Sequence, residues 1–133
     1  MLAALHYVGF VPVSDTSAAR RFYGDVLGLP VVDDSPFAVV VDAHGTQVRL
    51  TVVPHLTPQP FTVAGWATAD IDATVAALAG AGVAFIRYEG MEQDDLGIWT
   101  APGGDRVAWF RDPFDNTLSI STTGLATSIP PGV

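Results

Sequence analysis

The sequence carries the same order of local signals twice, and this repeat constrains the fold more than any other feature. In each half a strand-like segment leads to a candidate helix cap, which is Ser14 or Asp15 in the first half and Asp70 in the second, and then to apolar residues at helical spacing. A glycine ends each helix, at Gly28 and Gly82, and β segments follow. The chain is therefore predicted to fold as β-α-β-β-β twice. Such a repeat indicates two similar modules about an approximate twofold axis, with their sheets curved around a shared cavity.

The boundaries of the predicted elements follow from turn residues and periodicity. In the first half we expect a strand at 5–13, a helix between Asp15 and Gly28, and β segments at 31–34, 37–43 and 47–53. In the second half we expect a strand at 61–68, a helix after Asp70, strands at 83–88, 106–111 and 117–122, and a long loop at 89–105. The whole chain of 133 residues is predicted to be one domain. It would comprise module one at about 5–53, a proline-rich linker at 54–60, module two at about 61–122 and a loose tail at 123–133.

Composition excludes several classes of function. The net charge is −8 and all basic residues are arginine, which argues against nucleic acid as a partner because a basic face supplies most of that affinity. Cysteine is absent, so neither disulfides nor thiolate chemistry are expected. The N-terminus lacks the pattern of a signal peptide, and no apolar run reaches membrane-spanning length. We therefore expect a cytoplasmic protein that does not act at a membrane.

Three stretches of the sequence carry a family resemblance. They are "VSDTSAARRFYGDVLGLPVV", "ADIDATVAALAGAGVAF" and "VAWFRDPFDNTLSI". In this order they resemble the two helices and the closing hairpin of the vicinal oxygen chelate superfamily, over about residues 5–122. That superfamily includes glyoxalase I, extradiol dioxygenases, fosfomycin-resistance enzymes and bleomycin-binding proteins. The resemblance implies an α+β fold of two βαβββ modules, with curved mixed sheets around a shared cavity.

The acidic turn in the third stretch is predicted to be structural. Members of the family usually have Asp-Gly where this chain has Phe114 and Asp115. A positive φ is expected there, and Asp and Asn tolerate it best after glycine. Asp112 is expected to accept hydrogen bonds from backbone N–H groups within the turn.

The positions that hold a metal ion in the family lack suitable donors here. The resemblance places the four ligands at Val8, Arg49, Val63 and Ser119. Two aliphatic side chains cannot ligate, and arginine brings a fixed positive charge. His6, two residues before Val8 on the same face, remains an alternative ligand, although one histidine does not make a site. We therefore expect no metal and no other cofactor.

The predicted cavity is expected to persist without a metal and to bind a small molecule. Its candidate lining is Val8, Phe10, Arg49, Thr51, Val63, Trp66, Trp99, Trp109 and Ser119. Arg49 would bind an anionic or electron-rich oxygen, unless it points outward or pairs with a nearby aspartate. Trp99 follows the polar loop "MEQDDLGI", which would rim the mouth, and the acids of that loop are expected to be solvated charges.

Two functions remain open from the sequence. The favoured one is a metal-free small-molecule-binding protein. The alternative is an enzyme of this family, a lyase, isomerase or dioxygenase, either metal-free or with displaced metal ligands. No nucleophile–base pair or Gly-x-Ser-x-Gly elbow is visible, so no catalytic residue is predicted. A homodimer is expected, because a chain of this architecture leaves strand edges that pairing could cover.

Overall fold

The computed structural model describes residues 1–122, and these divide into two compact units. The first unit is Met1–Gln59 with Asp112–Asn116, and the second is Pro60–Arg111 with the chain from Thr117 onward. Each unit contains one four-stranded mixed sheet and helical turns between its first and second strands. The predicted α+β fold of two βαβββ-like modules is confirmed. The tail predicted at 123–133 lies outside the described residues.

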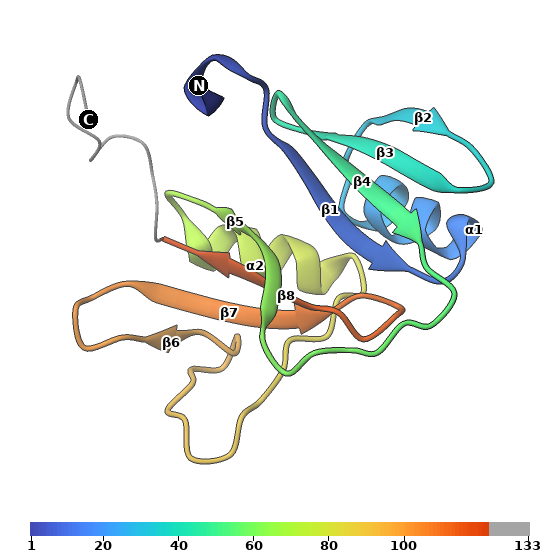
Figure 1. Ribbon diagram of the computed structural model, residues 1–133. Helices are drawn as coiled ribbons and strands as arrows, with labels where there is room; N and C mark the ends of the chain where they lie inside the picture. Colours follow the sequence, from blue (N-terminus) through green and yellow to red (C-terminus); the bar gives the residue numbers. More distant parts are fainter. Residues whose placement is uncertain (123–133) are drawn as a thin grey trace. The chain divides into compact units, whose positions relative to one another are not determined.

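The sheet of the first unit is built from the strands that the sequence predicts. They are β1 (Val8–Val13), β2 (Val31–Asp34), β3 (Ala38–Ala43) and β4 (Thr46–Val52). Their spatial order is β1-β4-β3-β2 (Figure 1). β1 runs parallel to β4, and the other pairs are antiparallel. β1 is therefore an edge strand of this sheet. A short 3₁₀ turn, η1 (Leu2–Ala4), precedes it.

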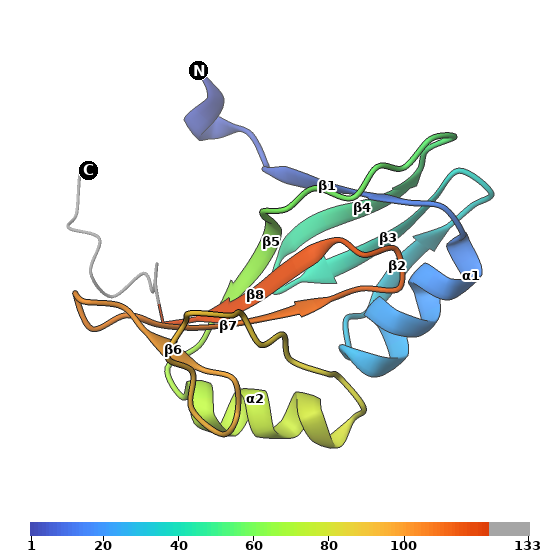
Figure 2. The same ribbon diagram turned by 90° about the horizontal axis from the view of Figure 1, so that it is seen from below.

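The helical segment of the first unit begins where its cap predicts. The Asp15 carboxylate accepts hydrogen bonds from the backbone N–H groups of Ser17 and Ala18, and α1 (Thr16–Ala19) follows. The helix continues as a π-helical segment, η2 (Arg20–Val26), and ends before Gly28, whose φ is 77°. Figure 2 shows it along one face of the sheet. The core between them contains Val11, Val13, Ala19, Tyr23, Val39, Val41 and Leu50. On β3 the residues of the opposite face, Ala38 and Val40, are buried as well.

The second unit repeats the arrangement with a shorter second strand. Its strands are β5 (Thr62–Ala67), β6 (Trp99–Thr100), β7 (Arg106–Arg111) and β8 (Thr117–Ser121), in the order β5-β8-β7-β6. α2 (Ile71–Gly80) begins at Asp70, which accepts a hydrogen bond from the Ala73 N–H, and packs against β7 and β8. The buried side chains Ile71, Val75, Ala108, Phe110, Leu118 and Ile120 form its core.

One ion pair fastens the start of α2 to β7. Both terminal nitrogens of Arg106 donate to the Asp72 carboxylate, over 2.7 and 3.0 Å. The hydrogen bond from Arg106 lowers the pKa of the Asp72 carboxyl. The pair also places a carboxylate in the first turn of the helix, where the helix dipole favours negative charge.

The prediction of a strand at 83–88 is wrong. Phe85 makes an isolated antiparallel bridge to Phe110, and no strand forms around it. Neighbouring backbone groups are satisfied by a side chain instead, because Gln93 accepts from the Tyr88 N–H and donates to the Ile86 carbonyl. The strand between α2 and β7 is β6, inside the stretch that the sequence predicts to be a loop.

The turn Asp112–Asn116 is structural, as predicted. Asp115 has a φ of 64°, which aspartate tolerates and most residues do not. Asp112 is buried, and its Oδ1 accepts from the backbone N–H groups of Phe114 and Asn116. Its Oδ2 accepts from the Asn116 amide, which also donates to the Pro12 carbonyl. The turn is thereby fixed to β1 of the first unit.

Tyr23 supplies the fourth hydrogen bond to Asp112. Its hydroxyl donates to Oδ2 over 2.6 Å, and the tyrosine is 1% exposed. Burial, and then the negative charge of Asp112, raise the pKa of the Tyr23 hydroxyl far above its usual range. The phenol therefore stays protonated and remains a donor. All the acceptor capacity of a buried carboxylate is used for holding the turn, which leaves Asp112 no role as a general base.

Within residues 1–122 no helix is long and apolar enough to cross a lipid bilayer.

Candidate functional site

The first sheet presents a face on which Arg49 is the central charge. In the strand register Phe10, Arg49 and Val40 lie side by side across β1, β4 and β3. Leu50 and its neighbours Val11 and Val39 point to the opposite, helix-covered face and are fully buried. The side chains of β4 therefore alternate between the two faces, with Arg49 on the face away from the helix.

The guanidinium of Arg49 is not engaged by another side chain of the described residues and is free to bind a ligand. The residue is half-buried, and its guanidinium makes no hydrogen bond or ion pair with any residue of the range 1–122. Neither an aspartate partner nor full exposure is found, although both were alternatives from the sequence. Phe10, beside it, is 65% exposed, so an aromatic ring and a cation are presented together.

Thr51 adds an unusual polar atom to the same face. It pairs with Pro12 and Ala38 in the register and stands two residues after Arg49. Its hydroxyl oxygen is buried and has no hydrogen-bond partner among the described residues. Buried polar atoms are nearly always paired in folded proteins, so this unpaired hydroxyl is an exception in the first sheet.

The second sheet presents its own face, with Gly65, Ser119 and Trp109 side by side across β5, β8 and β7. A Cβ atom at Gly65 would collide with the Ser119 hydroxyl and lie 3.2 Å from the Ser119 carbonyl oxygen. Glycine is therefore needed for β5 to lie this close to Ser119 of β8. On this face two small residues, Gly65 and Ser119, lie next to the large ring of Trp109.

An aromatic cluster extends this row toward the loop before β6. The ring centroids of Trp109 and Tyr88 are 5.5 Å apart in an edge-to-face arrangement, and those of Trp109 and Trp99 are 6.1 Å apart. Trp66 lies elsewhere. It pairs with Ile120 in the register, on the helix-covered face, and stacks on Phe110 at 6.5 Å. The structure thus brings Trp99, Trp109 and Ser119 to one face and separates Trp66 from them.

The remaining predicted lining residues lie on two strands. Val8 and Phe10 share the Arg49 face of the first sheet, and Val8 pairs with Gln47. Val63 is half-buried at an irregularity of β5, where the register to β8 shifts between Thr62 and Ala64. The role of each of these residues in ligand binding stays a prediction.

The donor set at the family's metal positions does not suit a divalent cation. Val8 and Val63 offer no ligating atom, Arg49 is cationic, and a single hydroxyl, that of Ser119, is a weak ligand. His6 is exposed before β1. In residues 1–122 no three His, Asp or Glu side chains gather into a group that could hold a metal ion.

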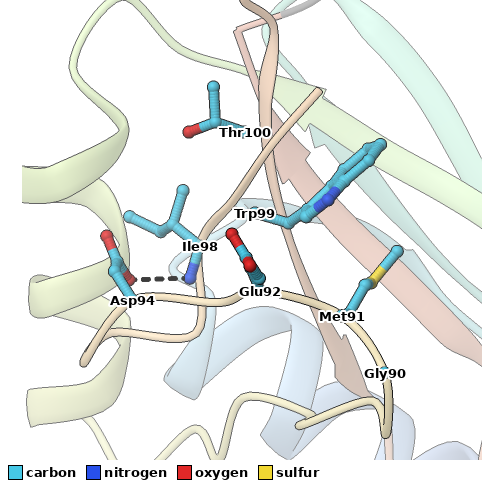
Figure 3. Close-up of a pocket in the computed structure, with 7 residues that line it drawn as sticks. All are labelled: Gly90, Met91, Glu92, Asp94, Ile98, Trp99 and Thr100. Carbon is cyan, nitrogen blue, oxygen red and sulfur yellow. Dashed lines mark hydrogen bonds between the residues drawn. The ribbon is translucent and has the colours of Figure 1, made fainter. Parts of the chain in front are cut away.

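A pocket of about 660 Å³ lies in the second unit between the loop after Tyr88 and β6 (Figure 3). It is lined by Gly90, Met91, Glu92, Asp94, Ile98, Trp99 and Thr100. The sequence predicts contact at Trp99 but treats Glu92 and Asp94 as solvated charges. The sequence pattern does not reveal the pocket that these two acids share. The pocket depends on the fold of the loop, in which the Gln93 amide donates to the carbonyls of Ile86 and Gly97.

Comparison with known proteins assigns the family. The model of the Glyoxalase/Bleomycin resistance protein/Dioxygenase superfamily matches residues 4–120, nearly the whole chain. The protein therefore belongs to this superfamily, also called the vicinal oxygen chelate superfamily, as the resemblance implies. No functionally curated protein matches the chain.

Solved structures agree on the fold. A superfamily member from Sphaerobacter thermophilus DSM 20745 is 26% identical, with a TM-score of 0.65 over 89% of this chain and 98% of that one. A lactoylglutathione lyase from Agrobacterium tumefaciens is 16% identical, with a TM-score of 0.68 over 89% and 92%. A glyoxalase/bleomycin resistance protein/dioxygenase from Alicyclobacillus acidocaldarius is 19% identical, with a TM-score of 0.64 over 88% and 89%.

Proposed function

We propose that this protein is a metal-free, cytoplasmic small-molecule-binding member of its superfamily. The ligand is an apolar or aromatic compound that carries an anionic or electron-rich oxygen. The observation that carries the proposal is that Arg49 is half-buried and that its guanidinium has no partner in residues 1–122. A cation taken partly out of water without a counter-charge costs free energy that an anionic ligand would recover.

One neighbour of Arg49 supports the ligand class. The ring of Phe10 is next to it in the strand register and largely exposed, which suits contact with an apolar or aromatic body. Val8, Arg49, Val63 and Ser119 do not make a metal-ligand set, so binding is favoured over a metal-dependent role as a lyase, isomerase or dioxygenase.

The Arg49→Met variant tests this proposal. It keeps the aliphatic stem and removes the charge, so affinity for benzoate should fall by about 1.5–3 kcal/mol, the range for a charge-assisted hydrogen bond. Folding should be nearly unaffected, since an unpaired cation is lost. Titration followed by amide NMR would measure the affinity, and urea unfolding would measure stability.

Matched controls make the result specific. Arg21 is exposed in the same unit, and Arg21→Met removes the same charge without touching the Arg49 face. Benzamide has the shape of benzoate without its charge. Equal benzoate affinity in wild type and Arg49→Met, or equal binding of benzamide and benzoate, would contradict the proposal.

We also propose that the protein is a homodimer. β1 is an edge strand, and the residues before it expose apolar side chains, with Leu5 66% and Tyr7 77% exposed. A second copy could cover both the unpaired edge and these side chains. Light scattering is expected to give twice the 14.0 kDa of one chain at all micromolar concentrations. A concentration-independent mass of one chain would refute the dimer.

A further inference from the structure

The pocket beside β6 in the second unit combines soft apolar walls with a free negative charge. Figure 3 shows the Trp99 ring and the Met91 side chain at one end, Asp94 and Ile98 at the other, and the Glu92 carboxylate between them. Glu92 is exposed and makes no hydrogen bond or ion pair with residues 1–122. It is therefore the acid of this pocket that can meet a ligand.

The other charged groups nearby are already engaged. Oδ1 of Asp94 accepts from the backbone N–H groups of Leu96 and Ile98, and its Oδ2 is 3.5 Å from Arg106. Arg106 is also bound to Asp72, and the Arg87 guanidinium donates to the carbonyls of Asp94 and Asp95. No basic side chain lines the pocket, so Glu92 gives it a negative charge with no internal cation to neutralise it.

The loop that carries Glu92 is held in place before any ligand arrives. The neighbouring Gln93 side chain accepts from the Tyr88 N–H over 2.7 Å and donates to the Ile86 and Gly97 carbonyls over 2.8 and 2.9 Å. Its backbone also bridges to Trp99. Because these bonds fix both walls, binding would require little ordering of the chain.

The indole wall determines which ligands the charge can select. Trp99 is oriented by its contact with Trp109, which in turn packs on Tyr88. Indole faces attract cations through the ring quadrupole, and organic ammonium ions gain most because their alkyl groups shed water easily. A thioether such as that of Met91 adds a polarizable contact.

We propose that this pocket binds an organic cation, namely an ammonium group with apolar or aromatic substituents, held by the Trp99 indole and the Glu92 carboxylate. The site is separate from the Arg49 face in sequence, in charge and in the unit to which it belongs. It can therefore be present whether or not the proposed anion site is.

Phenyltrimethylammonium is the probe, and the indole N–H signals in a ¹H–¹⁵N NMR spectrum are the readout. The signal of Trp99, assigned from its loss in Trp99→Leu, should shift with millimolar probe, while that of Trp66 should stay in place. The neutral alcohol 2-phenyl-2-propanol, which has nearly the same shape, should bind about fivefold or more weakly. Equal binding of the alcohol, or no shift of the Trp99 signal at millimolar probe, would overturn the proposal.

Two variants test whether the probe is attracted by the carboxylate of Glu92 or only by the net negative charge of the chain. Glu92→Gln should weaken probe binding about threefold to fivefold and leave the alcohol unchanged. Glu89→Gln removes the same charge from the same loop, at an exposed residue that does not line the pocket, and should have no effect. If the two variants weaken binding equally, or if Glu92→Gln has no effect, the assignment of Glu92 is wrong.

Discussion

Replacing Asp112 with alanine is expected to lower the free energy of unfolding by about 3–5 kcal/mol, because it leaves several buried or half-buried donors without an acceptor. Those donors are the Tyr23 hydroxyl, the Asn116 amide and the backbone N–H groups of Phe114 and Asn116. Urea unfolding followed by circular dichroism would measure the change. The loss should be larger than that of any other single substitution in the turn.

Asp115 provides the matched control within the same turn. It is exposed, and its positive φ suits asparagine as well as aspartate. Asp115→Asn removes a negative charge three positions from Asp112 and is expected to change stability by less than about 0.5 kcal/mol. If Asp112→Ala proved no more damaging than Asp115→Asn, the buried hydrogen-bond network would not be what stabilises the turn.

Stability is expected to fall steeply above pH 10 because of Tyr23. The pKa of its hydroxyl is raised in the folded protein, mainly by burial, relative to about 10 in the unfolded chain. Below pH 10 both states hold the proton and the stabilisation is complete. As the pH rises further, only the unfolded state releases it, so stability is lost progressively toward the folded pKa. By pH 12 this amounts to about 2–3 kcal/mol.

The Tyr23→Phe variant isolates this effect. It is expected to be less stable than wild type at pH 7 by about 1–2 kcal/mol, since Asp112 loses one donor. Between pH 10 and pH 12 its stability should be flatter, so the two unfolding curves should converge. The chain suits the measurement because it has no lysine and no cysteine to titrate in that range. Parallel curves for the two proteins would contradict the raised pKa.

The parts of the fold that could be predicted from the sequence are those fixed by local chemistry. Asp15 and Asp70 cap their helices, Gly28 and Gly82 adopt positive φ after them, and alternation places Arg49 away from the core. Each depends on a few neighbouring residues, so a pattern in the chain carries the information.

The parts that could not be predicted depend on contacts between distant residues. Residues 83–88 have the composition of a strand, but a glutamine further along takes up their backbone groups. Trp66 is predicted to line the cavity, but its pairing with Ile120 places it on the helix-covered face. The free state of Arg49 likewise depends on distant residues, since no aspartate of residues 1–122 is placed within ion-pair distance of it. A pattern of neighbouring residues does not show which distant group a backbone or side-chain atom will pair with.

Because Asp112–Asn116 belongs to the first unit, no single cut in the chain separates the two units. The proline-rich linker at 54–60 looks like a place to separate two halves, but the first unit is discontinuous in sequence. A fragment that ends at Gln59 would lack the carboxylate to which Tyr23 donates and the amide that binds the Pro12 carbonyl. The internal repeat therefore does not correspond to two autonomous folding modules. The first half of the chain is complete only together with residues 112–116.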